Sequence, residues 1–403
     1  MKWNAVKLGD ICIEGGIQTG PFGSQLHQSD YSDEGTPVVM PVDLIDGGIS
    51  TERIARVNDD HVQRLSRHML EPGDVVYARR GDVGRCSRVT QSEAGWLCGT
   101  GCLRLRADSN LVDKTFLYYA LSNPVVVGWV RNHAIGATMP NLNTTILGDV
   151  PLCIPDSLGA QRSIASILMA YDNLIENNRR QIVLLEEAAQ RLYKEWFVDL
   201  RFPEHENTEV VNGTPTGWTK CELGDVVHQS GNAEKKSNRD NYSHYLPIDS
   251  IPPKSITCWD SDAIENASSS LVAFKRDDFV FGAMRPYFHK VIIAPYAGLT
   301  RTTCFVLNVK DPDYWAYAFA VLTFGDCVRY ATSISVGTTM PYVRWEDLRH
   351  MPIVVPTKEM ATTFKSHFDN IRMRVEVLYK QLAEAREARD RLLPKLMSGE
   401  VGV

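Results

Sequence analysis

Residues 158–198 read LGAQRSIASILMAYDNLIENNRRQIVLLEEAAQRLYKEWFV, and this stretch decides how the chain folds. Apolar or aromatic side chains recur alternately four and three residues apart, with one polar exception. The ten positions are Ile164, Leu168, Tyr171, Ile175, Asn178, Ile182, Leu185, Ala189, Leu192 and Trp196. This alternation is a heptad seam, typical of a helix that packs along another helix, and a buried Asn178 can specify its register. A helix of this length would reach roughly 60 Å.

A second seam of the same kind lies about 200 residues later, in residues 359–396. Its ten positions are Phe364, Phe368, Ile371, Val375, Leu378, Leu382, Ala385, Arg389, Leu392 and Leu396. Pro394 is predicted to limit this helix near its end, because proline lacks the amide donor. Two matched long helices indicate a chain built twice. The alternative is that each helix belongs to an ordinary bundle.

Composition is that of an ordinary globular protein, with 403 residues and 44% hydrophobic residues. No apolar run is long enough to span a membrane, and the N-terminus lacks the apolar segment of a secretory signal. Nine cysteines without a CxxC pair indicate free thiols in a reducing, cytoplasmic location. The formal net charge of −6 argues mildly against a polyanionic partner, so the distribution of charge matters more than its sum.

The domain organisation follows from where the strand-like runs lie. Residues 36–42, 74–78 and 102–106 read as strands, and residues 114–121 as a short helix. We predict an α+β fold with two mixed globular domains, 1–155 and 219–356. The long helices occupy 156–198 and 357–403, and a polar linker occupies 199–218.

An internal repeat supports this division. Gly136-Ala-Thr-Met-Pro140 recurs as Gly337-Thr-Thr-Met-Pro341, 201 residues later and at the same distance ahead of a long helix. Most side chains between such landmarks differ, which suggests two domains doing one kind of job on two different targets. The GxTMP motif itself is interpreted as a tight loop that seats each domain on its helix, with direct contact of Thr138 or Thr339 to DNA as the alternative.

The order of these features resembles the specificity (S) subunit of type I restriction–modification systems. The motifs that carry the resemblance are GxTMP before each helix, LYKEWFVDLRFP…GTPTGW at 192–218 and LLPKLMSGEV at 392–401. The resemblance implies two target recognition domains, each reading half of a split, asymmetric DNA sequence. It implies that the two helices are antiparallel, related by a pseudo-two-fold, and dock two methyltransferase (M) subunits.

The resemblance also implies what the chain lacks. Restriction (R) subunits would join the assembly, which serves in phage defence, and the chain itself would carry no catalytic residue, metal or cofactor. S-adenosylmethionine, ATP and Mg²⁺ are expected in the partner subunits.

Candidate DNA-binding residues are basic or amide side chains in loops, which suit phosphates and base edges. A dense basic run follows a strand-like segment in the first half, and basic residues recur in the corresponding region of the second half. The set is Gln18, Thr19, Gln25, Arg79, Arg80, Arg85, Arg88, Lys235, Lys236, Arg239, Lys275, Arg285, Lys290 and Arg301. Ordinary solvated turns use the same residue types, so this alternative stays open.

Helix-pairing residues are drawn from the two seams. They are Ile164, Leu168, Tyr171, Ile175, Ile182, Leu185, Leu192, Phe364, Phe368, Ile371, Val375, Leu378 and Leu382. We find no nucleotide-binding loop, zinc-protease motif or serine-hydrolase motif. Two other classes remain open: a coiled-coil scaffold that does not read DNA, and an autonomous DNA-modifying enzyme.

Overall fold

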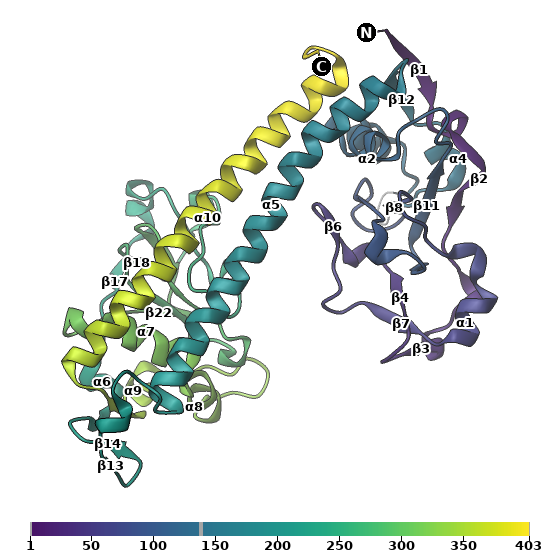
Figure 1. Ribbon diagram of the computed structural model, residues 1–403. Helices are drawn as coiled ribbons and strands as arrows, with labels where there is room; N and C mark the ends of the chain where they lie inside the picture. Colours follow the sequence, from purple (N-terminus) through teal and green to yellow (C-terminus); the bar gives the residue numbers. More distant parts are fainter. Residues whose placement is uncertain (1, 137–139, 403) are drawn as a thin grey trace. The chain divides into compact units, whose positions relative to one another are not determined.

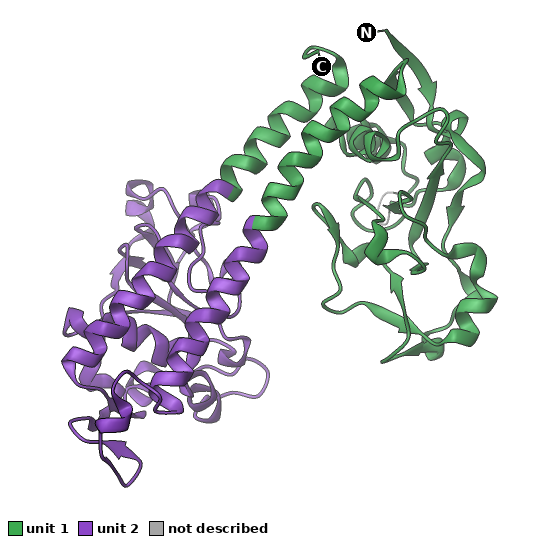
Figure 2. Ribbon diagram, in the orientation of Figure 1, with its two compact units in different colours: residues 1–177, 382–403 green, residues 178–381 purple. Residues whose placement is uncertain are grey.

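The computed structural model describes residues 2–136 and 140–402. The chain divides into two compact units (Figure 2). Unit 1 comprises Met1–Asn177 and Leu382–Val403, and unit 2 comprises Asn178–Gln381. Each long helix contributes one part to each unit, so the unit boundary falls inside both helices.

Unit 1 is built on an antiparallel four-stranded sheet in the order β2-β11-β8-β9 (Figure 1). Its strands are Cys12–Thr19, Cys102–Ala107, Val75–Ala78 and Cys86–Arg88. All four residues of the interior strand β8 are buried, as expected for a strand covered on both faces. A second sheet has the order β10-β4-β7-β3, with strands Leu97–Cys98, Thr36–Val39, Ala55–Val57 and Tyr31–Ser32. Two short pairs complete the strands, β1 (Trp3–Lys7) with β12 (Pro151–Pro155) and β5 (Leu44–Ile45) with β6 (Gly48–Ile49).

Unit 1 has short helices besides the long ones. They are α1 (Asp59–Arg64), α2 (Lys114–Ser122), α3 (Pro124–His133) and α4 (Thr144–Gly148). Helix α1 packs beside the second sheet through Val62, and α2 contacts β9 of the main sheet. Asp113 caps α2 by accepting the amides of Thr115 and Phe116, both at 3.0 Å. Asn123 caps α3, whose first residue is Pro124, a position at which proline costs no hydrogen bond. The predicted strands at 36–42, 74–78 and 102–106 and the predicted helix at 114–121 are therefore confirmed to within a few residues.

Unit 2 repeats this plan. Its main sheet has the order β16-β22-β19-β20, with strands Val227–Gln229, Cys304–Val309, Phe279–Gly282 and Val291–Ile293. A three-stranded sheet follows the order β17-β18-β21, with strands Asn232–Glu234, Leu271–Phe274 and Gly298–Arg301. The remaining strands are β15 (Thr219–Glu222) with β23 (Pro352–Val355), and β13 (Val210–Val211) with β14 (Thr214–Pro215). Its short helices are α6 (Leu223–Val226), α7 (Trp315–Phe324), α8 (Cys327–Ser333) and α9 (Trp345–Leu348).

The two units share connectivity as well as strand order. In each, a short strand precedes a four-stranded antiparallel sheet, which is followed along the chain by three short helices, a strand that pairs with the first one, and a long helix. β8 corresponds to β19 and β9 to β20, while α2, α3 and α4 correspond to α7, α8 and α9. The predicted α+β fold with an internal repeat is confirmed by this shared topology.

The long helices are α5 (Leu158–Tyr193) and α10 (Lys358–Ser398). Beyond Tyr193 the backbone passes into a π-helical turn, Lys194–Val198, so residues 158–198 are not one uniform α-helix. Pro394 lies inside α10 and does not limit it, contrary to prediction. The helix ends instead at Ser398, and the following Gly399 has a φ of +75°, the left-handed conformation that glycine adopts after a helix.

The helices run antiparallel within each unit. In unit 1, Ile164 and Leu168 share a core with Leu393 and Leu396, and Asp172 bonds Arg389 further along. In unit 2, Trp196 contacts Phe364, while Gln181 and Leu185 lie beside Leu378 and Gln381. Rising numbers on α5 meet falling numbers on α10 in both cases, which is the antiparallel arrangement that the resemblance implied.

The predicted helix-pairing residues are all at least half-buried. Nine are buried, namely Ile164, Leu168, Ile175, Ile182, Phe364, Phe368, Val375, Leu378 and Leu382, and Tyr171, Leu185, Leu192 and Ile371 are half-buried. Phe368 also contacts Trp315 and Phe319 of α7, with ring centroids 6.3 and 5.7 Å apart. This end of the seam therefore belongs to the core of unit 2 as well as to the helix surface.

Candidate nucleic-acid interface

One end of the main sheet in unit 1 gathers loop residues from distant parts of the chain. Thr19 at the end of β2 pairs with Leu103, and Ala78 at the end of β8 pairs with Cys102. Because β11 begins where both neighbours finish, Gln18 and Thr19 lie at the same end as Arg79 and Arg80. We name this end of the sheet the loop edge of unit 1. It includes the turn between β8 and β9 and the hairpin that Ile135 and Asn141 close.

A hairpin closes this edge. The backbone groups of Ile135 and Asn141 exchange two hydrogen bonds, at 3.0 and 2.8 Å, and Asn141 also bridges to Arg80. Gly136 inside the hairpin has a φ of +114°, which a residue with a Cβ rarely adopts. Thr138 and Met139 of the motif lie outside the described residues.

Unit 2 builds the same hairpin. Val336 and Tyr342 exchange hydrogen bonds of 2.9 and 3.0 Å, and Gly337 has a φ of +109°. The amide of Arg285, just past β19, donates to the carbonyl of Pro341 at 2.7 Å. The GxTMP loop is therefore seated on the end of the sheet. The interpretation that it seats the domain on the long helix is wrong, and the exposed Thr339 is left at the loop edge.

The two neighbouring arginines of unit 1 have different environments. Arg79 is half-buried, and its Nε donates to Asn141 Oδ1 at 3.1 Å and to the carbonyl of Leu142 at 3.0 Å. Burial, with the adjacent Arg80 charge, lowers the pKa of Arg79, although a guanidinium stays protonated at neutral pH. Arg80 is exposed. Arg79 thus holds the hairpin in place, while Arg80 is the cation that reaches solvent.

The other DNA-binding candidates of unit 1 beyond the sheet end have side chains that make hydrogen bonds within the unit. Arg85 donates to Asp82 at 2.8 Å and to the carbonyl of Leu44 at 3.2 Å. Arg88 pairs along the strand with Val75, at the opposite end of the sheet, and donates to Thr115. Gln25 lies in a 3-10 turn and accepts the amide of Phe22 at 3.3 Å.

Unit 2 brings four of its predicted cations to the corresponding end. Gly282 at the end of β19 pairs with Cys304, Arg285 follows it, and Lys290 precedes β20. Glu234 pairs with Leu271, which pairs with Arg301, so Lys235 and Arg301 share one end of the second sheet. The amide of Ala283, after β19 of the main sheet, donates to the carbonyl of Thr303, after β21 of the second sheet. This hydrogen bond joins the ends of the two sheets. We name this region the loop edge of unit 2.

The predicted basic residues of unit 2 also differ in whether their side chains are hydrogen-bonded within the unit. Lys290 donates to the carbonyls of Ile248 and Asp249 at 2.8 and 3.2 Å, and Arg239 donates to the carbonyl of Glu265. Lys235 and Lys236 are exposed. Lys275 follows the far end of β18, so the structure places it away from the loop edge.

Sequence reasoning missed an aromatic pair at this edge. Tyr287 and Phe288 lie in the turn between β19 and β20 and are 50% and 47% exposed. Aromatic residues after a proline gave no periodic signal, because their exposure depends on how the turn folds.

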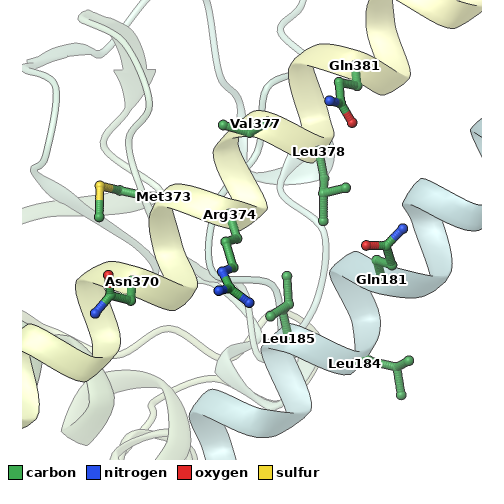
Figure 3. A pocket seen from close by; sticks show the side chains of 9 residues that line it. All are labelled: Gln181, Leu184, Leu185, Asn370, Met373, Arg374, Val377, Leu378 and Gln381. Carbon is green, nitrogen blue, oxygen red and sulfur yellow. The ribbon is translucent and has the colours of Figure 1, made fainter.

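An apolar groove lies between the long helices within unit 2 (Figure 3). Its volume is about 610 Å³. The lining residues are Gln181, Leu184, Leu185, Asn370, Met373, Arg374, Val377, Leu378 and Gln381. Leu184, Met373 and Val377 are more than half exposed, which is unusual for large apolar side chains on one surface.

Comparison with known proteins agrees with this architecture. Residues 1–187 match the family model described as type I restriction modification DNA specificity domain. The type I restriction enzyme MjaIX specificity subunit of Methanocaldococcus jannaschii is 24% identical over 422 residues, covering 100% of this chain and 94% of that protein. The type I restriction enzyme EcoDI specificity subunit of Escherichia coli is 20% identical, covering 72% and 71%. The first 187 residues thus match a type I specificity domain, and the whole chain is similar to specificity subunits of type I restriction–modification systems.

A solved specificity subunit shows the same fold. The crystal structure of the S subunit from M. genitalium has a TM-score of 0.61 at 14% identity, covering 98% of this chain and 96% of that one. The family model and the relatives confirm the resemblance seen in the sequence, and the solved structure shows that the fold is shared.

Among residues 2–136 and 140–402, no three His, Cys, Asp or Glu side chains lie close enough to hold a metal ion. Within the same ranges, no helix has both the length and the apolar character needed to cross a membrane.

Proposed function

We propose that the chain reads a bipartite, asymmetric DNA target, one half with each loop edge. One observation carries this proposal: the same edge is built twice with unlike side chains. Unit 1 presents Gln18, Thr19 and Arg80, whereas unit 2 presents Lys235, Arg285 and Arg301 with an aromatic pair. A shared frame with different side chains is suited to reading two different half-sites.

The division of labour follows from the chemistry of these groups. Contacts of Arg80 and Lys235 to phosphates would supply salt-dependent affinity that is blind to sequence. Arginine forks and amides can instead bind base edges, with about 1–3 kcal/mol of discrimination for each bidentate pair. We propose residues 1–155 and 219–356 as the two target recognition domains, with 156–198 and 357–403 as helices and 199–218 as linker. The starts of α5 at Leu158, β15 at Thr219 and α10 at Lys358 support these bounds.

The helices are proposed to dock the methyltransferase subunits. The groove of Figure 3 offers exposed Leu184, Met373 and Val377 beside the polar ends of Gln181 and Arg374, a mixture found at protein–protein interfaces. In this proposal the chain is non-catalytic, and restriction subunits complete the complex. S-adenosylmethionine, ATP and Mg²⁺ would act in those partners.

The two neighbouring arginines test the DNA interface. The chain is co-expressed with its methyltransferase subunits, and methylome sequencing of the host identifies the target duplex. Arg80→Ala should weaken binding of that duplex and reduce the slope of log affinity against log salt by about one, because one phosphate contact is lost. Its stability should match that of the parent.

Arg79→Ala is the matched control for a structural role. It should lower the stability of unit 1 by about 1–3 kcal/mol, because Nε holds two oxygens of the hairpin. Binding of both variants at parental strength, over several salt concentrations, would contradict the assignment of this edge.

The same preparation separates the rival classes. A chain that lets the methyltransferase subunits assemble but binds no DNA would be a scaffold. Transfer of labelled methyl groups to DNA by the chain alone would make it an autonomous enzyme. A symmetric or undivided methylation site would contradict the bipartite target.

A further inference from the structure

The turn between β19 and β20 displays two aromatic side chains in contact. Tyr287 and Phe288 are each about half exposed, with ring centroids 4.8 Å apart and ring planes at 57°. Large apolar groups gathered at one surface point indicate a site that is covered in use.

Hydrogen bonds from three directions hold this turn. The amide of Arg285 donates to the carbonyl of Pro341 at 2.7 Å, and the amide of Lys254 donates to the carbonyl of His289 at 2.9 Å. The imidazole Nε2 of His289 lies 2.6 Å from the carbonyl of Thr323 at the end of α7. The aromatic pair is thus presented by a rigid support, so little conformational entropy is lost when it binds.

Backbone strain is concentrated in the same place. Lys254, Arg285 and His289 have φ values of +59°, +50° and +56°, although each carries a Cβ. The equivalent turn of unit 1 takes its positive φ values at glycines, Gly81 at +77° and Gly84 at +109°. Among the described residues, every non-glycine residue with positive φ belongs to unit 2. Strain that glycine would relieve is retained in unit 2, a pattern typical of functional turns.

The surroundings of the pair favour a polyanion. Lys254, Arg285 and Lys290 lie in or next to the turn, so their charges would attract phosphates to it. Apolar and aromatic side chains that enter duplex DNA unstack one base step and kink the helix. Pyrimidine–purine steps yield most easily to such a kink.

We propose that Tyr287 and Phe288 form a wedge that enters the stacked bases of the half-site bound by unit 2, at a pyrimidine–purine step. This inference rests on the proposed DNA-reading function. The equivalent turn of unit 1 has no such pair: Val83 is buried, and Asp82 bonds both Arg85 and Arg131. The duplex is therefore distorted in one half-site and not in the other.

The test uses the complex of the chain with its methyltransferase subunits. The probe is a fluorescein-labelled duplex with the target found by methylome sequencing. A second set of duplexes carries a fluorescent adenine analogue at successive positions other than the methylated bases. The wedge variant is Tyr287→Ala with Phe288→Ala. The matched control is Val210→Ala with Val211→Ala, an adjacent pair in β13 of the same unit, 48% and 52% exposed.

The wedge variant should bind the target about tenfold to a hundredfold more weakly, the effect of losing aromatic stacking on a base. In the parent, fluorescence should rise at one step of the unit 2 half-site, and this rise should vanish in the wedge variant. The control pair should leave both readouts unchanged.

Three outcomes overturn the wedge. Parental affinity and parental fluorescence in the wedge variant would do so directly. Loss of methyltransferase subunits from the purified variant would reassign the pair to a protein contact. A parent complex that binds no DNA would overturn the proposed function and the wedge together, whereas the first two outcomes leave the proposed function standing.

Discussion

In each unit, a side chain of a long helix bonds a loop beside the outer strand of the main sheet, β9 in unit 1 and β20 in unit 2. We call this contact the anchor of the unit. The helix side chain is a cation in unit 1 and a carboxylic acid in unit 2. In unit 1, Arg389 of α10 bonds Asp46 at 3.0 and 3.1 Å and Asp172 at 2.8 Å. Tyr119 donates to the same Asp172 at 2.5 Å. The helix supplies the cation, and carboxylates on two other segments compensate it.

In unit 2 the helix supplies a carboxylate. Glu186 of α5 accepts the amide of Ile256 at 2.8 Å, in the loop whose carbonyl bonds Ile293 of β20. Burial raises the pKa of Glu186 to about 7, an effect that the backbone hydrogen bond only partly offsets. For Arg389, burial lowers the pKa, but the hydrogen bonds and charges of Asp46 and Asp172 outweigh it and leave the pKa raised.

This difference teaches that two units with the same fold can be stabilised by different interactions. The anchor of unit 1 is a compensated ion network, which should be insensitive to pH near neutrality. The anchor of unit 2 is a carboxylate that changes charge in that range. Three experiments sharpen or break this contrast.

The largest effect is expected for Arg389→Met. Removing the guanidinium leaves Asp172, with 16% of its side chain exposed, without its cation. Breaking a buried pair in this way costs about 3–5 kcal/mol. Hydrogen exchange in the unit 1 parts of α5 and α10, together with urea unfolding, measures this loss.

The matched control is Arg391→Ala, two residues further along α10, whose exposed pair with Glu387 should contribute less than about 1 kcal/mol. Equal losses in the two variants would mean that the ion network does not anchor unit 1.

A smaller effect, with a defined pH dependence, is expected for Glu186→Gln. The folded pKa lies above the unfolded value of 4.5, so the folded state holds a proton that the unfolded state releases. Stability is therefore lost as pH rises from about 4.5 to about 7, and the loss is complete above that range. The amide oxygen of glutamine can still accept from Ile256 without a charge.

We expect the variant to be more stable than the parent by about 2–3 kcal/mol above pH 7, a figure reduced for the partial exposure of Glu186, and equal to it near pH 4.5. Unfolding of unit 2 at several pH values measures the difference. Glu187→Gln, at an exposed neighbour paired with Arg191, is the control and should show no such trend. A constant difference across the range would remove the titrating anchor from unit 2.

The smallest effect, and an equal one in the two units, is expected for Gly136→Ala and Gly337→Ala. Each glycine has a φ above +100° in the equivalent hairpin of its own unit, so alanine should lower the stability of that hairpin by about 1–2 kcal/mol. Exchange of the Asn141 and Tyr342 amides, which close the two hairpins, reports the loss. Unequal losses would show that the hairpins differ in function despite their common geometry.

The sequence predicted the helices better than the binding edge. Heptad spacing located α5 and α10, because burial against a neighbour leaves a periodic trace in one chain segment. The polar seam position Arg389 had no explanation in that pattern. Its partners Asp46 and Asp172 come from segments far away in the sequence, so only the folded unit reveals the network.

The candidate site shows the same limit. Residue type alone cannot separate Arg79, which holds a hairpin, from Arg80, which faces solvent. Lys275 and Arg285 belong to one basic region of the sequence, yet they lie at opposite ends of β19. The aromatic pair Tyr287–Phe288 had no sequence signal at all.

By itself the sequence determined the family, the α+β class, the internal repeat and the long amphipathic helices, since these depend on local periodicity and on motifs a fixed distance apart. The tertiary structure alone decided which side chains meet at each loop edge and which carry the anchors. Strand pairing joins residues that are distant in sequence, and burial, hydrogen bonding and charge at a side chain depend on those neighbours rather than on the residue's own segment.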